Sequence, residues 1–139
     1  MAKHCETFDH TADVGLAARA DSLGELLEAL AEGLANLICP IDQVQPAHVR
    51  QVSADSEDAE ALAVDFLVEV MNLIQVDHFP VRSARVLEAS ATRVRAELYG
   101  EPYDPARHAI EHEVKAVTYH QLTIAQQAGQ WVGRVILDL

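Results

Sequence analysis

The segment from residue 55 to about residue 75 constrains the fold most strongly, because its apolar residues recur at helical spacing around most of a helix. Three acidic residues in the stretch 55–58 begin the segment and suit the positive end of a helix dipole. Only Asp58, Asp65, Glu69 and Asn72 form a polar stripe. We therefore predict a helix that is largely buried, between a sheet and another element. Its apolar residues are Leu62, Ala63, Val64, Phe66, Leu67, Val68, Val70, Met71, Leu73 and Ile74.

An earlier amphipathic helix is predicted over residues 23–38. Ser22 and Glu25 have the spacing of a capping box, in which the serine side chain accepts a hydrogen bond from the third helical N–H group. The helix should end at the Cys39-Pro40 pair, because proline cannot continue it. Its apolar face consists of Leu23, Leu26, Leu27, Leu30, Leu34, Leu37 and Ile38.

The rest of the chain has the short, alternating segments that are typical of strands. About seven to eight strands and two helices, without regular alternation, predict a single α+β domain over residues 1–139 with a mostly antiparallel sheet. Residues 100–105 hold two prolines and should form a rigid loop. The predicted strands span residues 4–9, 16–20, 48–54, 81–88, 92–99, 112–119, 120–126 and 131–137.

The charge balance narrows the possible partners. The 139 residues contain 10 Lys and Arg against 22 Asp and Glu, which gives a formal charge of −12. Such a domain repels a phosphate backbone, so tight direct binding of nucleic acid is not expected. The charge favours a cation or a basic protein partner. It also promotes solubility, and this alone could account for it.

The same composition gives expectations about the compartment. No run approaches the roughly 18 apolar residues that a membrane span requires, so we expect no contact with a membrane. The first residues lack the continuous apolar stretch of a signal peptide. Cys5 and Cys39 do not have the spacing of a metal site. We therefore expect two reduced thiols in a cytoplasmic protein.

Sequence motifs of common enzymes are absent. The chain contains no GxGxxG or GxxxxGK[ST] loop for phosphate and no GxSxG nucleophile turn. These absences favour a protein without catalytic activity of its own.

Carboxylates near the two ends of the chain are the strongest candidates for a binding site. Asp13 lies in a predicted turn between strands, where Thr11 and Gly15 permit close approach of a ligand. Asp138 follows an apolar strand, and Leu139 adds a terminal carboxylate beside it. Oxygen donors of this kind suit hard cations such as Ca²⁺, Mg²⁺ or Mn²⁺. Spacing alone does not show that the two ends meet.

Histidines offer weaker candidates. His108 and His112 are four residues apart, as zinc-binding residues on a helix would be, but the segment resembles a strand, on which they would be about 13 Å apart. His10 and His120 each end a predicted strand beside a turn, and they are candidates for a place near the site. A hydrogen-bonding role in a loop is the alternative for both.

Asp65 and Glu69 lie on one face of the predicted second helix, one turn apart. Like charges at this spacing repel each other by a few tenths of a kcal/mol. A narrow face in contact with solvent explains them adequately. A cation or a basic partner that relieves the repulsion is the alternative.

Four segments resemble the archease family in sequence and in order along the chain. They are HTADVG at residues 10–15, GEPYD at 100–104, VKAVTYH at 114–120 and VILDL at 135–139. The resemblance covers essentially the whole chain, and HTADVG and KAVTYH are specific in combination. It implies a small acidic α+β protein that binds a divalent metal ion, which would be calcium with magnesium or manganese as alternatives.

The resemblance also implies a site and a partner. Asp13 and Asp138 would be metal ligands, and Leu139 would contribute a main-chain oxygen, which requires the first and last strands to be neighbours. The partner would be an RtcB-type RNA ligase of tRNA splicing or RNA repair, whose guanylylation and turnover the protein would stimulate without catalysing a reaction. Two alternatives remain open: a small metal-dependent hydrolase with His10 or His120 as the base, and a chaperone-like acidic interaction module.

Overall fold

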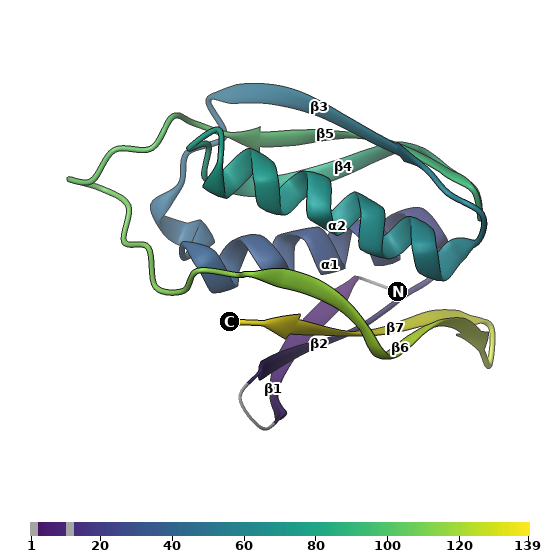
Figure 1. Ribbon diagram of the computed structural model, residues 1–139. Helices are drawn as coiled ribbons and strands as arrows, with labels where there is room; N and C mark the ends of the chain where they lie inside the picture. The colour runs from purple at the N-terminus through teal and green to yellow at the C-terminus, as the bar shows by residue number, and fades with distance from the viewer. Residues whose placement is uncertain (1–2, 11–12) are drawn as a thin grey trace.

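Two helices lie side by side between two antiparallel sheets in the computed structural model, which describes residues 3–10 and 13–139 (Figure 1). A short 3-10 turn, η1 (Ile41–Gln43), follows α1. In chain order the elements are β1 (His4–His10), β2 (Asp13–Ala20), α1 (Leu23–Ile38), β3 (His48–Asp55), α2 (Ala59–Gln75), β4 (Val81–Ala89), β5 (Arg93–Gly100), β6 (Ala116–Gln127) and β7 (Gln130–Asp138).

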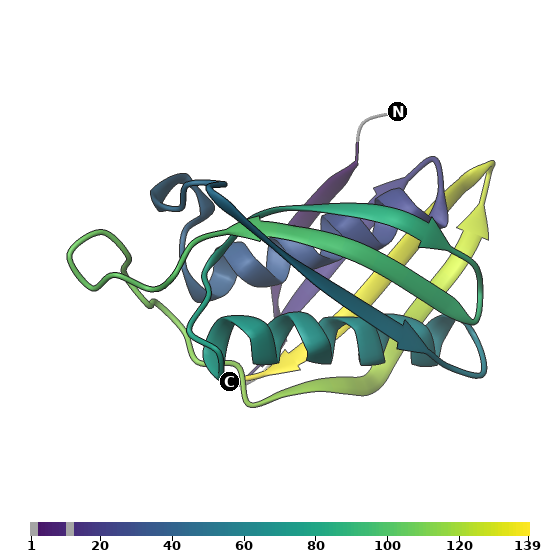
Figure 2. The same ribbon diagram turned by 90° about the horizontal axis from the view of Figure 1, so that it is seen from above.

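The strands form two sheets rather than the single sheet that the sequence predicted. One sheet has the strand order β1-β2-β7-β6 and the other has the order β3-β5-β4. Figure 2 shows the three-stranded sheet lying across both helices. The α+β class and the antiparallel pairing are confirmed. The division into two sheets follows from the helices, because each has apolar residues on more than one side and needs cover from both directions.

Both helices begin and end close to the predicted residues. The Ser22 hydroxyl accepts a hydrogen bond from the Glu25 N–H group at 3.1 Å and donates one to the Glu25 carboxylate at 3.1 Å, which confirms the capping pair. Asp58 caps α2 by accepting a hydrogen bond from the Ala61 N–H group at 2.8 Å. The apolar side of α2 is buried, with Phe66 fully inaccessible to solvent. Neither α1 nor α2 is both long and apolar enough to cross a bilayer.

Side chains of α1 accept hydrogen bonds from backbone N–H groups of the edge strand β4. Glu32 accepts a hydrogen bond from the Ala84 N–H group at 2.9 Å, and Glu28 accepts one from the Val86 N–H group at 2.7 Å. Lys3 pairs with both carboxylates at 3.1 Å. Exposed strand edges invite pairing with other chains, so this arrangement closes one edge of the three-stranded sheet.

The last third of the chain differs from the prediction. The two strands expected at residues 112–119 and 120–126 are one strand, β6, with an irregular pairing to β7 between Thr118 and Thr123. Gln121 there has a positive φ of 52°. Residues 112–115 lie outside the sheet, because the Gln75 side-chain amide occupies the backbone groups of Val114. It accepts a hydrogen bond from the Val114 N–H group at 2.8 Å and donates one to the Val114 carbonyl oxygen at 2.9 Å. This interaction between distant residues removes them from the strand.

Candidate functional site

Asp13 and Asp138 lie directly opposite each other on neighbouring strands. Asp13 is the first residue of β2, not a loop residue, and its Cα is the register partner of the Asp138 Cα at the end of β7. Residues directly opposite in an antiparallel pair point to the same face of the sheet, with Cβ atoms about 4.5–5.5 Å apart. Figure 1 shows the C-terminal end of β7 beside β2. The required strand pairing therefore exists, although it involves the second strand rather than the first.

The two carboxylates have no counter-charge within the described residues. Asp13 is half-buried and Asp138 is exposed, and neither forms an ion pair with a basic side chain of residues 3–8 or 13–139, the residues whose side chains the structure describes. Like charges directly opposite each other destabilise a sheet. The repulsion is relieved when a cation lies between them, so this strand end is suited to bind one.

The remaining donors at this strand end are in the main chain. The Asp138 carbonyl oxygen accepts a hydrogen bond from the Lys115 N–H group at 2.8 Å. Leu139 is half-buried and packs against the core, so its main chain is held close to Asp138. Among the described residues no three His, Cys, Asp or Glu side chains form a metal-binding group. The main chain of Leu139 is thus one oxygen donor held beside the two carboxylates.

The histidines expected near this site are placed differently. The backbone of His10 is the register partner of Asp13 on β1, while the His10 side chain and Thr11 lie outside the described part of the structure. His120 is exposed, four residues along β6 from Ala116, the register partner of Asp138. On a strand this is roughly 13 Å. The pairing of β6 with β7 is irregular between Thr118 and Thr123, so the register assigns His120 no partner on β7.

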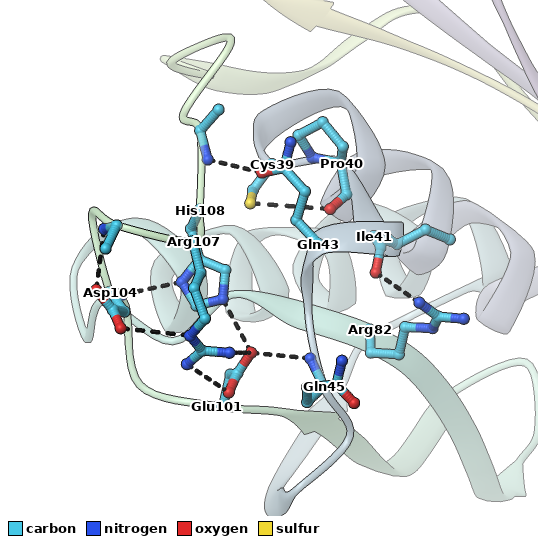
Figure 3. A network of polar contacts seen from close by, with 12 residues as sticks. Cys39, Pro40, Ile41, Gln43, Gln45, Arg82, Glu101, Asp104, Arg107 and His108 are labelled. Carbon is cyan, nitrogen blue, oxygen red and sulfur yellow. Dashed lines mark hydrogen bonds and ion pairs between the residues drawn. The ribbon is translucent and has the colours of Figure 1, made fainter.

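A second cluster surrounds the buried carboxylate of Glu101 at the start of the loop 101–115 (Figure 3). The Arg107 guanidinium donates two parallel hydrogen bonds to the Glu101 carboxylate, both at 2.9 Å. The Gln45 N–H group donates a third at 2.8 Å, and His108 Nε2 lies 2.9 Å from Glu101 Oε2. These donors lower the pKa of Glu101 from its ordinary value of 4.5 to about 2, with Arg107 as the largest cause, although burial opposes the shift.

The same cluster excludes the zinc site considered for His108 and His112. His108 Nδ1 accepts a hydrogen bond from the Asp104 N–H group at 2.9 Å, so Nε2 carries the proton that is donated to Glu101. Both ring nitrogens are therefore occupied by protein groups, and the His108 side chain is fully buried. His112 is exposed. His108 and His112 therefore form no zinc site, as the sequence favoured, but the reason is that His108 supports a loop and not that the segment is a strand.

The cluster holds a long loop in one conformation. Residues 101–115 contain no helix or strand, and Figures 1 and 2 show this segment extending beyond the three layers. Backbone bonds hold it to the helix layer: Ala109 donates to the Gln43 side chain at 2.7 Å and Glu111 donates to the Ile38 carbonyl at 2.8 Å. Gly100, the last residue of β5, leads into the loop at a point where a Cβ atom would clash with the Pro80 carbonyl oxygen.

Sequence reasoning identified the loop but not its bracing. A buried Glu and His in a loop rich in proline give no periodic pattern, and their partners are Gln45 and Arg107, one of them far away in the chain. The available signal was composition: a long stretch without apolar periodicity in a small domain is usually functional or disordered. Its GEPYD segment was predicted to be part of a rigid loop from its prolines, and the family resemblance singled it out a second time.

Comparison with known proteins identifies the family of this chain. Residues 5–139 match the model of the Archease protein family (MTH1598/TM1083). The chain is 34% identical to the protein archease of Pyrococcus abyssi, over 99% of both chains, and 35% identical to that of Methanopyrus kandleri, over 96% of this chain and 98% of the other. The chain belongs to the archease family.

Solved structures of archeases share the fold. The solution structure of Methanobacterium thermoautotrophicum protein 1598 superposes with a TM-score of 0.80 at 30% identity, covering 97% of this chain and 98% of the other. A crystal structure from Thermotoga maritima, described as an archease and possible chaperone, has a TM-score of 0.63 at 18% identity and covers 96% of both chains. The second likeness concerns the fold alone.

The remaining candidate residues of this archease lie on the exposed face of α2 or are free thiols. Asp65, Glu69 and Asn72 are exposed along α2, as the polar stripe predicted, and Asp65 accepts a hydrogen bond from the Ser56 hydroxyl at 2.6 Å. Cys5 and Cys39 are both free thiols. Burial and nearby acids raise the pKa of Cys5 to about 12, so its thiol is unreactive at neutral pH.

Proposed function

We propose that this archease is a non-catalytic accessory protein that binds one divalent cation through Asp13, Asp138 and Leu139. In this role it activates an RtcB-type RNA ligase by promoting its guanylylation and turnover in tRNA splicing or RNA repair. The observation that carries the proposal is the direct opposition of Asp13 and Asp138 on β2 and β7 in a chain of this family.

The donor set supports a hard cation that is only partly enclosed. Two carboxylates and a main-chain oxygen are fewer than the six to eight oxygens that Ca²⁺ takes, so water or a partner's groups would complete the shell. Asp138 is exposed, which leaves one side of the site accessible. When bound, the cation would neutralise the facing carboxylates and place positive charge at the protein surface. Calcium fits this flexible arrangement best, with magnesium and manganese as alternatives.

The charge of the chain supports a protein partner. With a formal charge of −12, the surface is complementary to a basic protein and repels free RNA. The ligase would therefore supply the contacts with RNA and the reacting groups, while this chain would position charge near the ligase residue that is guanylylated.

A guanylylation assay of the purified ligase tests the proposal. Adding the wild-type protein should increase guanylylation, and both Asp13→Asn and Asp138→Asn should remove most of this stimulation while the fold is retained. Glu69→Gln is the matched control, because it removes one exposed negative charge from α2 and should leave stimulation unchanged. Normal stimulation by both Asp variants would contradict the assigned site. Stimulation that survives chelators would favour a chaperone-like module instead.

A further inference from the structure

A pocket of about 230 Å³ opens where the ends of both helices meet the braced loop. Ile38 at the end of α1 and Ile74 at the end of α2 form its apolar floor, while Tyr103, Ile110 and Glu113 of the loop form its wall. An apolar cavity of about 150 Å³ is large enough to bind benzene. The pocket therefore has room for one large apolar side chain.

Apolar side chains around this pocket are exposed. Ile110 is 51% exposed and Tyr103 is 39% exposed, and both belong to the pocket wall. They are two of the six large apolar residues exposed in the described part of the chain. Apolar groups gathered at a concave surface are typical of an interaction site.

The pocket wall is rigid. Glu101 and His108 are buried and bonded within the loop, and burying such groups is unfavourable unless their bonds are complete. The fold nevertheless places them where they brace a segment that holds Tyr103 and Ile110 in solvent. A surface fixed in this way binds a partner with a smaller loss of conformational entropy than a mobile loop would.

The electrostatics of the pocket favour a positively charged neighbour. Glu113 lines it and Glu111 is exposed on the same stretch, while Lys115 follows them. His78 is the titratable nitrogen base in the lining, and Arg107 of the same loop is paired with Glu101 and Asp104. The last turns of α1 and α2 also lie at the pocket, and neither contains a basic residue that would offset the negative end of its dipole.

We infer that this pocket receives an apolar side chain flanked by Arg or Lys from a protein partner. The inference rests on the proposed function only in naming the partner as the ligase. The pocket and its charge complementarity specify the chemistry of the inserted segment, which would be anchored by one buried side chain as at other protein interfaces.

A peptide experiment tests the pocket without the ligase. The ¹⁵N-labelled protein would be titrated to millimolar concentrations of acetyl-Arg-Phe-Arg-amide, and the amide signals of Gln75, His78 and Ile110 should shift. Acetyl-Glu-Phe-Glu-amide, with the same apolar residue and reversed charge, should bind several-fold more weakly. Shifts elsewhere on the surface, no shifts, or equal binding of both peptides would overturn the inference.

Two variants then separate the pocket from general surface effects. Ile110→Asp should abolish the shifts and weaken binding of the ligase at least ten-fold. Leu87→Asp is the matched control, because Leu87 is 37% exposed on β4, roughly 20 Å along the strand from the pocket, and it should change neither result. Circular dichroism would verify that both variants fold.

The outcomes distinguish the two proposals. Unchanged ligase affinity in Ile110→Asp, together with normal activation by the wild type, would overturn the pocket and leave the proposed function intact. Absence of activation by the wild type would overturn the proposed function, while the peptide titration would still decide whether the pocket takes an apolar and basic segment.

Discussion

The two acidic regions of this archease use carboxylates in opposite ways. Glu101 is buried and accepts bonds from Arg107, Gln45 and His108, so its charge is fully compensated. Asp13 and Asp138 face each other across two strands, with no basic side chain paired to either among the described residues. A compensated carboxylate stabilises the fold and has no capacity left for a ligand. The uncompensated pair places two like charges opposite each other, and in the proposed function this pair binds the cation.

The largest expected effect comes from removing the compensated carboxylate. Glu101→Ala should lower the free energy of unfolding by about 3 kcal/mol, because it leaves the His108 N–H group and one side of Arg107 without a partner. Urea denaturation monitored by circular dichroism measures this change. Asp138→Ala is the comparison, and its stability should stay close to that of the wild type; equal losses in the two variants would remove the distinction between the regions.

Addition of a cation should act only on the other region. Calcium at about 100 times its dissociation constant should stabilise the wild type by about 2.7 kcal/mol, because it binds the folded state alone. Thermal unfolding with and without calcium measures the shift. The shift should disappear in Asp13→Asn and persist in Glu69→Gln, and a shift that survives in Asp13→Asn would place the cation elsewhere.

Acid should weaken the braced loop in a defined range. The pKa of Glu101 is about 2 in the folded protein against 4.5 ordinarily, so its stabilising contribution is complete above about pH 4.5 and is lost as the pH falls towards 2. The free energy of unfolding should fall by about 2 kcal/mol. This is less than the shift of the pKa alone would give, because Arg107 is partly exposed and water screens its charge. Comparing the free energy of unfolding of the wild type and Glu101→Gln between pH 6 and pH 2.5 isolates the contribution of the ionised Glu101 carboxylate. A difference between them that does not shrink with acid would contradict the assignment.

The smallest expected effect tests the repulsion at the strand end. In the presence of a chelator, Asp138→Asn should stabilise the protein by a few tenths of a kcal/mol, because it removes one of two like charges directly opposite each other. Replicate urea titrations can resolve a change of this size if the dependence of the free energy of unfolding on urea concentration is the same in both proteins. Destabilisation by Asp138→Asn under these conditions would mean that the carboxylate already has a compensating partner.

Features that depend on residues close together in the chain were predicted correctly, and features that depend on distant residues were not. The helix at residues 23–38 was predicted at its observed bounds, and the capping pair of Ser22 and Glu25 forms as expected. The strand boundaries at residues 112–115 were wrong because Gln75, far away in the chain, binds the Val114 backbone. The bracing of Glu101 was missed for the same reason, since its partner Gln45 comes from another part of the chain.

The sequence by itself therefore determined the helices, most strands, the acidic charge and the residue types able to hold a hard cation. These properties depend on composition and on contacts between residues a few positions apart, which periodicity reports directly. The tertiary structure decided the division into two sheets and the saturation of Glu101. It also set the register that brings Asp13 and Asp138 face to face. Each depends on which distant segments pair, and strand pairing is fixed by the packing of the whole core rather than by any local pattern.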